Sequence, residues 1–117
     1  MAAANEGAKR IAGSLTVGIL PAPETPISPH VDVAIVTGLG SARNNVNVLS
    51  SDVVIAVGAG GPGTASEVAL ALKAGKPVIL LTAPRLAAQF FTELSGARVH
   101  SAATPAAACA IAKALLR

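Results

Sequence analysis

A glycine-rich segment, GAGGPGT at residues 58–64, is the part of this sequence most suited to chemistry. Its glycines carry no Cβ, so a ligand can approach the main chain closely. The segment stands between an apolar run at 52–58 and a helical pattern at 65–74. Backbone N–H groups at the start of a helix attract anions, and phosphate is the natural occupant of such a loop. We therefore predict a phosphate-binding loop formed by Gly60, Gly61, Gly63 and Thr64.

Three other interpretations of this segment compete with a phosphate-binding loop. Gly58, Gly60 and Gly63 formally satisfy GxGxxG, but a dinucleotide fold also needs an acidic residue about twenty residues later. The only charge near the end of the next apolar run is Arg85, which disfavours NAD and leaves NADP as a weak alternative. A Walker loop is disfavoured because no lysine follows Gly63. A tight strand-to-helix turn without a ligand stays open.

Two charged residues could act beside the loop. Glu67 could polarise a ligand group or an attacking water. It could equally complete a capping box with Thr64, in which each side chain bonds the main chain of the other residue. Arg43 could donate to a phosphate, or could be a solvated arginine at a helix start. His30 and His100 have no partner at a metal-ligand spacing, so we predict no metal site.

Composition restricts the classes of protein that remain. The 117 residues predict a single domain over 1–117, and with 52% hydrophobic but only 13% charged residues we expect copies to associate. The basic residues are scattered, and Trp and Tyr are absent, which argues against nucleic acid. No apolar run is long enough for a membrane span, so we expect a cytoplasmic protein. The single cysteine, Cys109, is predicted to be a small core residue.

The order of apolar and helical segments predicts an α/β fold. Apolar strands that alternate with helices are typical of a parallel sheet covered on both faces, here a doubly wound, Rossmann-like sheet. Such sheets bind ligands beyond the carboxyl ends of their strands. Thr104 and Pro105 predict a capped helix start. We expect strands at 15–20, 31–37, 52–58, 77–82 and near 98–101, and helices at 1–12, within 38–51, at 65–74, at 86–95 and after Thr104.

The amino-acid sequences of two segments resemble those of a known family. GGPGTASEVALALKAGKPVILL resembles the PGGxGTxxE loop of the LONELY GUY-like nucleotide-binding superfamily, whose members were once mislabelled as lysine decarboxylases. TGLGSARNNVNVLSSDVVIAVG resembles the segment of that superfamily that carries an arginine. The sequence of this second segment is more similar to the molybdenum-cofactor-carrier branch than to the phosphoribohydrolase branch. The resemblance covers about residues 1–82 and is strong over 37–81.

The resemblance implies a function for several residues. The loop glycines, Thr64 and Glu67 match the family motif, whereas Ala59 stands where proline is usual. Arg43 matches the family arginine, and with Asn44 it would flank the phosphate. The phosphoribohydrolases carry a lysine where this chain has Asn44, and often a glutamate where it has Ser66.

We therefore expect a binder of a phosphorylated small molecule, similar to a carrier that holds the molybdenum cofactor as cargo and requires no cofactor of its own. The first alternative is a phosphoribohydrolase that acts on a nucleoside 5′-monophosphate, with Glu67 and Arg43 catalytic. The second is a structural subunit that binds no ligand. The same resemblance places Met1 on a methionine that follows a βαβ segment in the family, so we expect that first segment to be absent from this chain. It also implies a homo-oligomer.

Overall fold

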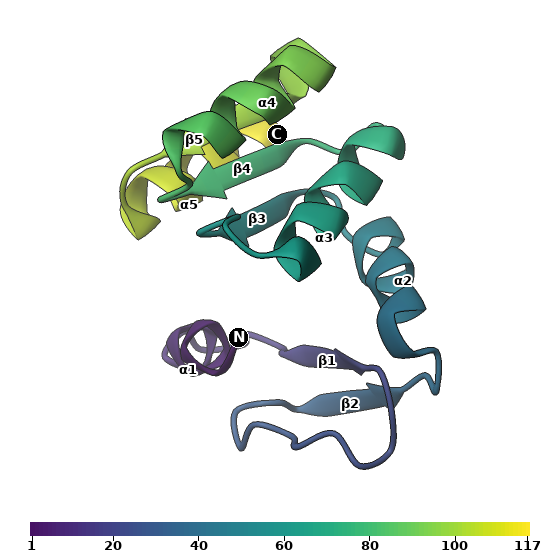
Figure 1. Cartoon of the computed structure of the whole chain (residues 1–117). Coiled ribbons are helices and arrows are strands. Elements are labelled where there is room, and N and C mark those ends of the chain that lie inside the picture. The colour runs from purple at the N-terminus through teal and green to yellow at the C-terminus, as the bar shows by residue number, and fades with distance from the viewer. The chain divides into compact units, whose positions relative to one another are not determined.

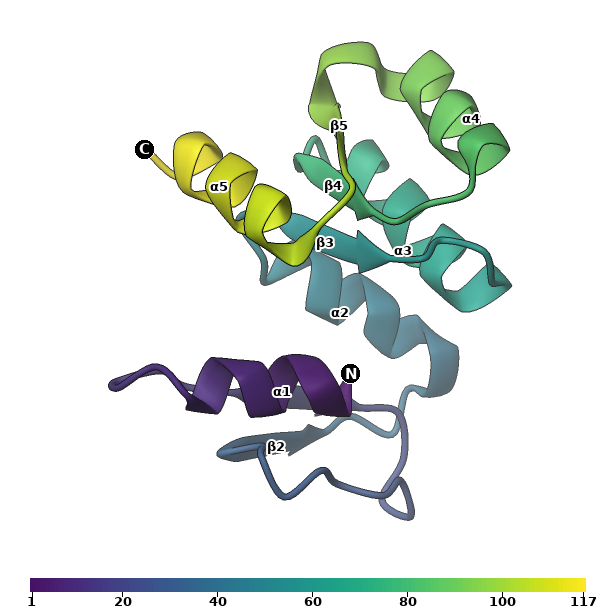
Figure 2. The same ribbon diagram turned by 90° about the vertical axis from the view of Figure 1, so that its left-hand side faces the viewer.

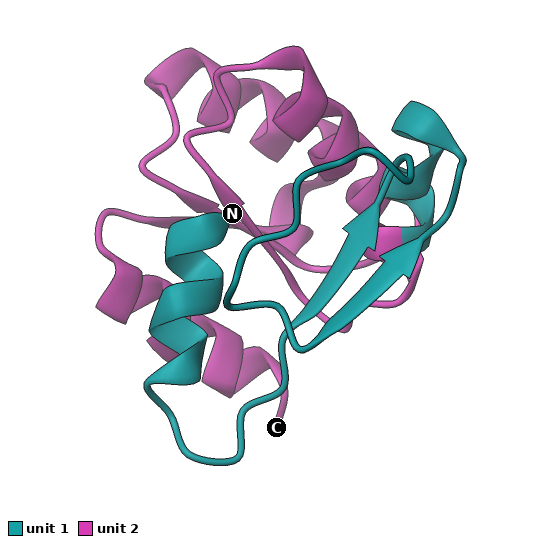
Figure 3. Ribbon diagram, turned by 90° about the horizontal axis from the view of Figure 1, so that it is seen from below, with its two compact units in different colours: residues 1–46 teal, residues 47–117 magenta.

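The computed structural model describes residues 1–117, which divide into two compact units, residues 1–46 and residues 47–117 (Figure 3). The N-terminal unit contains helix α1 (Ala2–Lys9) and strands β1 (Val17–Leu20) and β2 (Val33–Val36). A 3-10 turn at Gly40–Ala42 leads into helix α2 (Arg43–Leu49), which ends in the second unit. The strands pair in parallel as a two-stranded sheet, and an irregular proline-containing connection joins them as expected.

The C-terminal unit is a regular alternation of strands and helices (Figure 1). Its three strands pair in parallel in the order β3-β4-β5, each followed by a helix. The α/β class with parallel strands is thereby confirmed. The elements are β3 (Val54–Val57), α3 (Pro62–Lys73), β4 (Val78–Leu81), α4 (Arg85–Ser95), β5 (Val99–Ala102) and α5 (Pro105–Leu115).

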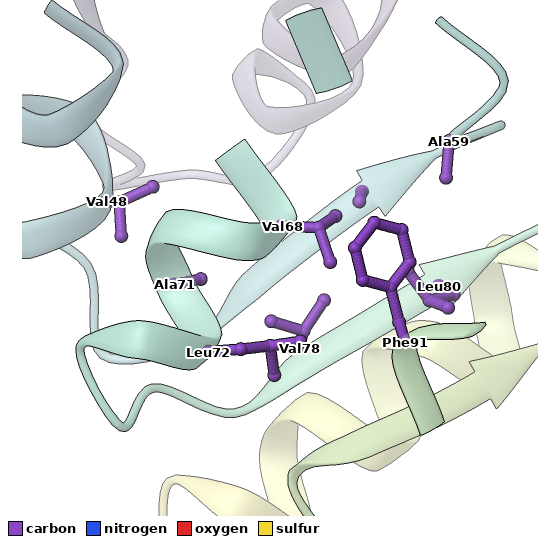
Figure 4. Packing of buried hydrophobic residues seen from close by; sticks show 9 residues of the cluster. Val48, Ala59, Val68, Ala71, Leu72, Val78, Leu80 and Phe91 are labelled. Carbon is purple, nitrogen blue, oxygen red and sulfur yellow. The ribbon is translucent and has the colours of Figure 1, made fainter. Parts of the chain in front are cut away.

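Helices cover both faces of the three-stranded sheet, as Figure 2 shows for α5 on one side and α3 and α4 on the other. Strand β4 lies in the middle, and its side chains alternate between the two layers. Val78 and Leu80 pack with residues of α3 and α4, whereas Ile79 and Leu81 pack against α5. This is the doubly wound arrangement. Figure 4 shows the first layer, in which Val68, Ala71, Leu72 and Phe91 surround the β4 side chains.

In helix α5 the structure confirms the predicted start and contradicts the predicted burial of the cysteine. Thr104 caps α5, because its Oγ1 accepts the amide hydrogen of Ala107 at 3.2 Å, which confirms the predicted helix start. The prediction for Cys109 is wrong, because this thiol is exposed. The buried side of α5 is formed by Ala108, with Ile111 and Ala112 partly buried beside it, and one step along a helix turns a side chain by about 100° away from that face.

A polar cluster joins the elements of the N-terminal unit. The Asp32 carboxylate accepts from Lys9 Nζ at 2.9 and 3.0 Å, from the Thr16 amide at 2.8 Å and from Thr16 Oγ1 at 2.9 Å. The side-chain hydrogen bond from Lys9, followed by the bonds from Thr16, lowers the pKa of Asp32 to about 2. The cluster therefore connects α1 to the residues that directly precede both strands. None of the helices in either unit has the length and apolar character that crossing a bilayer requires.

Candidate functional site

The loop after β3 turns sharply before it reaches the helix. The Gly58 amide donates to the Leu81 carbonyl at 2.9 Å, and Gly58 then takes a φ of 79°. Ala59 also lies in the left-handed region, with a φ of 44°, and the residue is 5% exposed and belongs to the core cluster that includes residues of α3. Proline fixes φ near −65° and could not adopt this conformation. Alanine at position 59 can therefore take part in this turn, whereas the proline that is usual in the family could not.

Helix α3 begins at Pro62, three residues earlier than the sequence suggested. Gly61 is its N-cap, with φ −112° and ψ 156°, and no side chain caps the helix. The first bond of the helix runs from the Ala65 amide to the Gly61 carbonyl. The four amides before it that carry a hydrogen have no acceptor within the chain, and they belong to Gly60, Gly61, Gly63 and Thr64. Together with the positive end of α3, they form a set of donors suited to an anion.

The fold does not require glycine at the three predicted phosphate-binding positions. None of Gly60, Gly61 and Gly63 has a φ in the left-handed region. A Cβ at Gly61 or Gly63 would meet nothing within 4 Å, and at Gly60 it would make only ordinary contacts. Gly75, at the end of α3, is different because its φ of 73° is a conformation that favours glycine. The glycines of the loop thus leave open space, whereas Gly75 allows a backbone conformation that other residues rarely adopt.

Glu67 is not part of a capping box, and that interpretation is wrong. Thr64 is the third residue of α3 rather than its cap, so the first turn is already formed where the box would have to close. The Glu67 carboxylate instead accepts a hydrogen bond from Nδ2 of Asn47 at 3.3 Å. Asn47 was missed in the sequence, because twenty residues separate the two positions and no pattern links them. The structure therefore adds Asn47 to the candidate site residues in the C-terminal unit.

The other two predicted site residues belong to the N-terminal unit. Arg43 is half-buried, and its Nη1 donates to the Ile19 carbonyl at 3.2 Å. Its neighbour Asn44 is 8% exposed. Arg43 therefore has a structural partner near the end of strand β1, and its role toward a phosphate stays a prediction. The C-terminal unit by itself brings together the loop, Glu67 and Asn47.

A cleft of about 510 Å³ lies at the carboxyl ends of β4 and β5. Pro84, which precedes α4, has its Cγ 3.9 Å from the position that a Cβ on Gly60 would take, so the loop and the start of α4 are neighbours. Alanines and two hydroxyl-bearing residues make up most of the wall. The lining residues are Leu80, Thr82, Ala83, Ala88, Ser101, Ala102 and Ala103.

Parallel strands between two helical layers, with a glycine-rich turn from a strand into a helix, define a Rossmann-like protein, and proteins of this class bind ligands at the carboxyl ends of the strands. Sequence comparison gives the family. The SLOG cluster4 family model matches residues 1–109, and the chain belongs to this family, in the carrier branch of the LONELY GUY-like superfamily.

Two solved structures and one further sequence are similar to this chain. The molybdenum cofactor carrier protein of Chlamydomonas reinhardtii is 59% identical with a TM-score of 0.87, over 97% of this chain and 68% of that one. The molybdenum cofactor binding protein of Rippkaea orientalis is 50% identical with a TM-score of 0.87, over 97% and 69%. An uncharacterized protein of Archaeoglobus fulgidus is 48% identical over 84 residues, which are 72% of this chain. That match spans only 54% of the archaeal protein.

Proposed function

We propose that this chain binds a phosphorylated small molecule at the loop 60–64 and carries it as cargo, in the manner of a molybdenum cofactor carrier. The observation that supports this most is the open space at Gly61 and Gly63, where the fold would accept a side chain and the sequence has none. A Cβ at either position would stand where an anion meets the free amides of the loop. A turn that served the fold alone would not need these two glycines.

The molybdenum cofactor is the cargo that we propose, because the Chlamydomonas carrier protein and the Rippkaea binding protein for this cofactor share half or more of their aligned residues with this chain. Its pterin bears a phosphate, and the loop offers donors and space for such a group. The cargo would be held by hydrogen bonds, and no resident cofactor is needed. Arg43 and Asn44 are proposed to support phosphate binding, and the site is proposed to act in the cytoplasm.

Hydrolysis is the less favoured function. Ser66 stands where the phosphoribohydrolases often carry a glutamate, and its hydroxyl donates to the Gly63 carbonyl at 2.7 Å. A hydroxyl that bonds its own helix cannot replace a carboxylate in acid–base chemistry. Free base released from AMP by the wild type, and lost in Glu67→Gln, would overturn the carrier proposal in favour of the hydrolase.

The binding proposal is tested by a pair of glycine variants. Gly63→Ala places a methyl group in the open space at the start of α3, so the affinity for a pterin phosphate should fall by about tenfold or more. The free energy of unfolding should stay the same or rise by up to about 1 kcal/mol, because alanine suits a helix better than glycine.

Gly75→Ala is the matched control, and it should give the opposite result. A Cβ at a φ of 73° costs about 1–2 kcal/mol of stability while the loop is untouched. Calorimetric titration with 6-hydroxymethylpterin phosphate and urea unfolding measure the two quantities. Full affinity in a folded Gly63→Ala protein would remove the phosphate-binding loop from the proposal.

We also propose that copies of the chain associate through the outer face of α4. Leu86, Phe90 and Leu94 lie four residues apart along this helix and are 73%, 57% and 58% exposed. Their spacing is symmetric about Phe90, so an antiparallel second copy lays Leu86 of each chain against Leu94 of the other. Light scattering should give a larger mass for the wild type than for Phe90→Glu, with Thr92→Glu as the control. A wild-type monomer at micromolar concentration would contradict this proposal.

A further inference from the structure

The Glu67 side chain carries the only carboxylate of the loop motif, and a hydrogen bond from Asn47 holds it in one orientation. Asn47 lies near the end of α2 and Glu67 in the second turn of α3, and Nδ2 of the first donates to Oε1 of the second at 3.3 Å. The neighbouring residue Val48 is 1% exposed and packs in the core cluster with Val68 and Leu72 of α3. The backbone on either side of the pair is therefore held in place by buried apolar contacts.

Both side chains keep hydrogen-bonding capacity beyond their mutual bond. Oε2 of Glu67 accepts no hydrogen bond within the chain, and Oδ1 of Asn47 accepts none either. A carboxylate oxygen that accepts one bond can accept a second. Both residues are half-buried rather than fully solvated. The pair therefore presents oriented acceptors, with no donor except the remaining Nδ2 hydrogen.

Glu67 follows the phosphate-binding loop along the axis of α3. Gly63 and Glu67 are four residues apart in α3, so they lie on the same side of the helix. The rise between them is about 6 Å, at about 1.5 Å per residue. A ligand whose phosphate meets the loop amides can thus direct another part of itself along this side of α3 toward Glu67. A ligand part that binds there needs to offer hydrogen-bond donors.

We infer that Asn47 is a positioning residue that orients the Glu67 carboxylate to accept two parallel N–H donors, from the 2-amino group and the adjacent ring N–H of a pterin. This inference rests on the proposed function, because it concerns the part of the ligand beyond the phosphate. Two parallel N–H groups match the two oxygens of a carboxylate, as in bidentate arginine–carboxylate pairs. A ribose diol would also reach a carboxylate, but its recognition would not depend on the ring.

The experiment compares two ligands that differ at that edge alone. 6-Hydroxymethylpterin phosphate carries the 2-amino group, whereas 6-hydroxymethyllumazine phosphate has a carbonyl oxygen there, which would face the carboxylate with an acceptor. The wild type should bind the pterin about tenfold or more tightly than the lumazine, as expected for a lost hydrogen bond to a charged group. Calorimetric titration gives both dissociation constants, and their ratio is the quantity of interest.

Three variants test whether the ratio of the two dissociation constants depends on Asn47 and Glu67. Glu67→Gln should reduce the ratio to near one, because the amide presents one acceptor and one donor. Asn47→Ala should reduce it as well, and Asn47→Asp, which keeps the size but puts a second negative charge 3.3 Å away, should displace Glu67 and do the same. Asn45→Ala is the control, since Asn45 is exposed on the same helix. Its ratio should equal that of the wild type.

The affinity for inorganic phosphate is the second measurement, and it should be unchanged in Asn47→Ala and Asn47→Asp. A merely structural role for Asn47 would weaken phosphate and both ring compounds together and leave the ratio intact, which would overturn the inference. Equal binding of the two compounds by the wild type would overturn it as well, while the proposed phosphate site survived. Binding of neither compound, nor of phosphate, would remove the proposed function and this inference together.

Discussion

Strands β2 and β4 are both four-residue, apolar and parallel, yet their surroundings differ completely. The residues of β4 are between 0% and 8% exposed, since α3 and α4 cover one face and α5 the other. Every residue of β2 is exposed, including Ile35 at 46% and Val36 at 48%. The comparison shows that an apolar strand indicates a need for cover without indicating whether its own chain provides it.

The two units are also held together by different interactions. All buried apolar residues of the chain belong to the C-terminal unit, where they form clusters on both faces of the sheet. The N-terminal unit depends on the cluster around Asp32, in which Lys9 and Thr16 supply the donors. Hydrophobic burial involves no titrating group and is not screened by ions, whereas hydrogen bonds within an ion pair at the surface respond to both pH and ionic strength. The units should therefore respond differently to the same perturbations.

The largest expected effect separates the two strands directly. Ile79→Ala removes a side chain that is fully buried between β4 and α5, and it should cost about 2–5 kcal/mol in the free energy of unfolding. Ile35→Ala, with the same chemical change on β2, should cost less than about 1 kcal/mol, because the side chain is nearly half exposed. Urea unfolding measures both. Equal costs would show that β2 is covered in solution, for example by a second copy.

A smaller effect is expected from the polar cluster. Thr16 is 6% exposed, and its hydroxyl shares one hydrogen between the His30 carbonyl and the Asp32 carboxylate while it accepts the amide hydrogen of Asp32. Thr16→Val keeps the shape, but it leaves the His30 carbonyl without a partner and removes one of the several hydrogen bonds to the Asp32 carboxylate, which should cost about 1–3 kcal/mol. The loss should appear as faster amide hydrogen exchange in β1 and β2. Unchanged protection there would show that the N-terminal unit does not depend on the cluster.

The smallest effect is a pH dependence confined to the N-terminal unit. The pKa of Asp32 is lowered from 3.8 to about 2 in the folded chain, chiefly by Lys9. The folded state therefore binds this proton less readily than the unfolded state, so the contribution is present above pH 4 and is lost as the pH falls toward 2. The protection of the β1 and β2 amides, taken relative to their intrinsic exchange rates at each pH, should fall over that range, and the fall should be smaller in Asp32→Asn. An identical acid response in both proteins would exclude Asp32 as its cause.

The sequence predicted most of the fold, because periodicity and turn residues are local signals. All five strands and the order of elements are confirmed, as is the Thr104 cap. The helical pattern in the sequence begins at residue 65 and α3 at Pro62, because the low helix propensity of Gly61 and Gly63 gives no local signal for the first turn. The Asn47–Glu67 bond depends on the packing of α2 against α3, which is a tertiary contact. No local pattern in the sequence encodes such a contact.

The anchors at both ends of the loop have a consequence for kinetics. Ala59 is fixed by burial and Pro62 by its ring, so only the short stretch between them is left to order when a ligand arrives. A loop that is already arranged loses little conformational entropy on binding, and association is then set by encounter rather than by rearrangement. The residence time of the cargo would depend mainly on the hydrogen bonds that must break on release. Delivery to an acceptor would therefore be controlled by dissociation, which an acceptor can accelerate by competing for those same bonds.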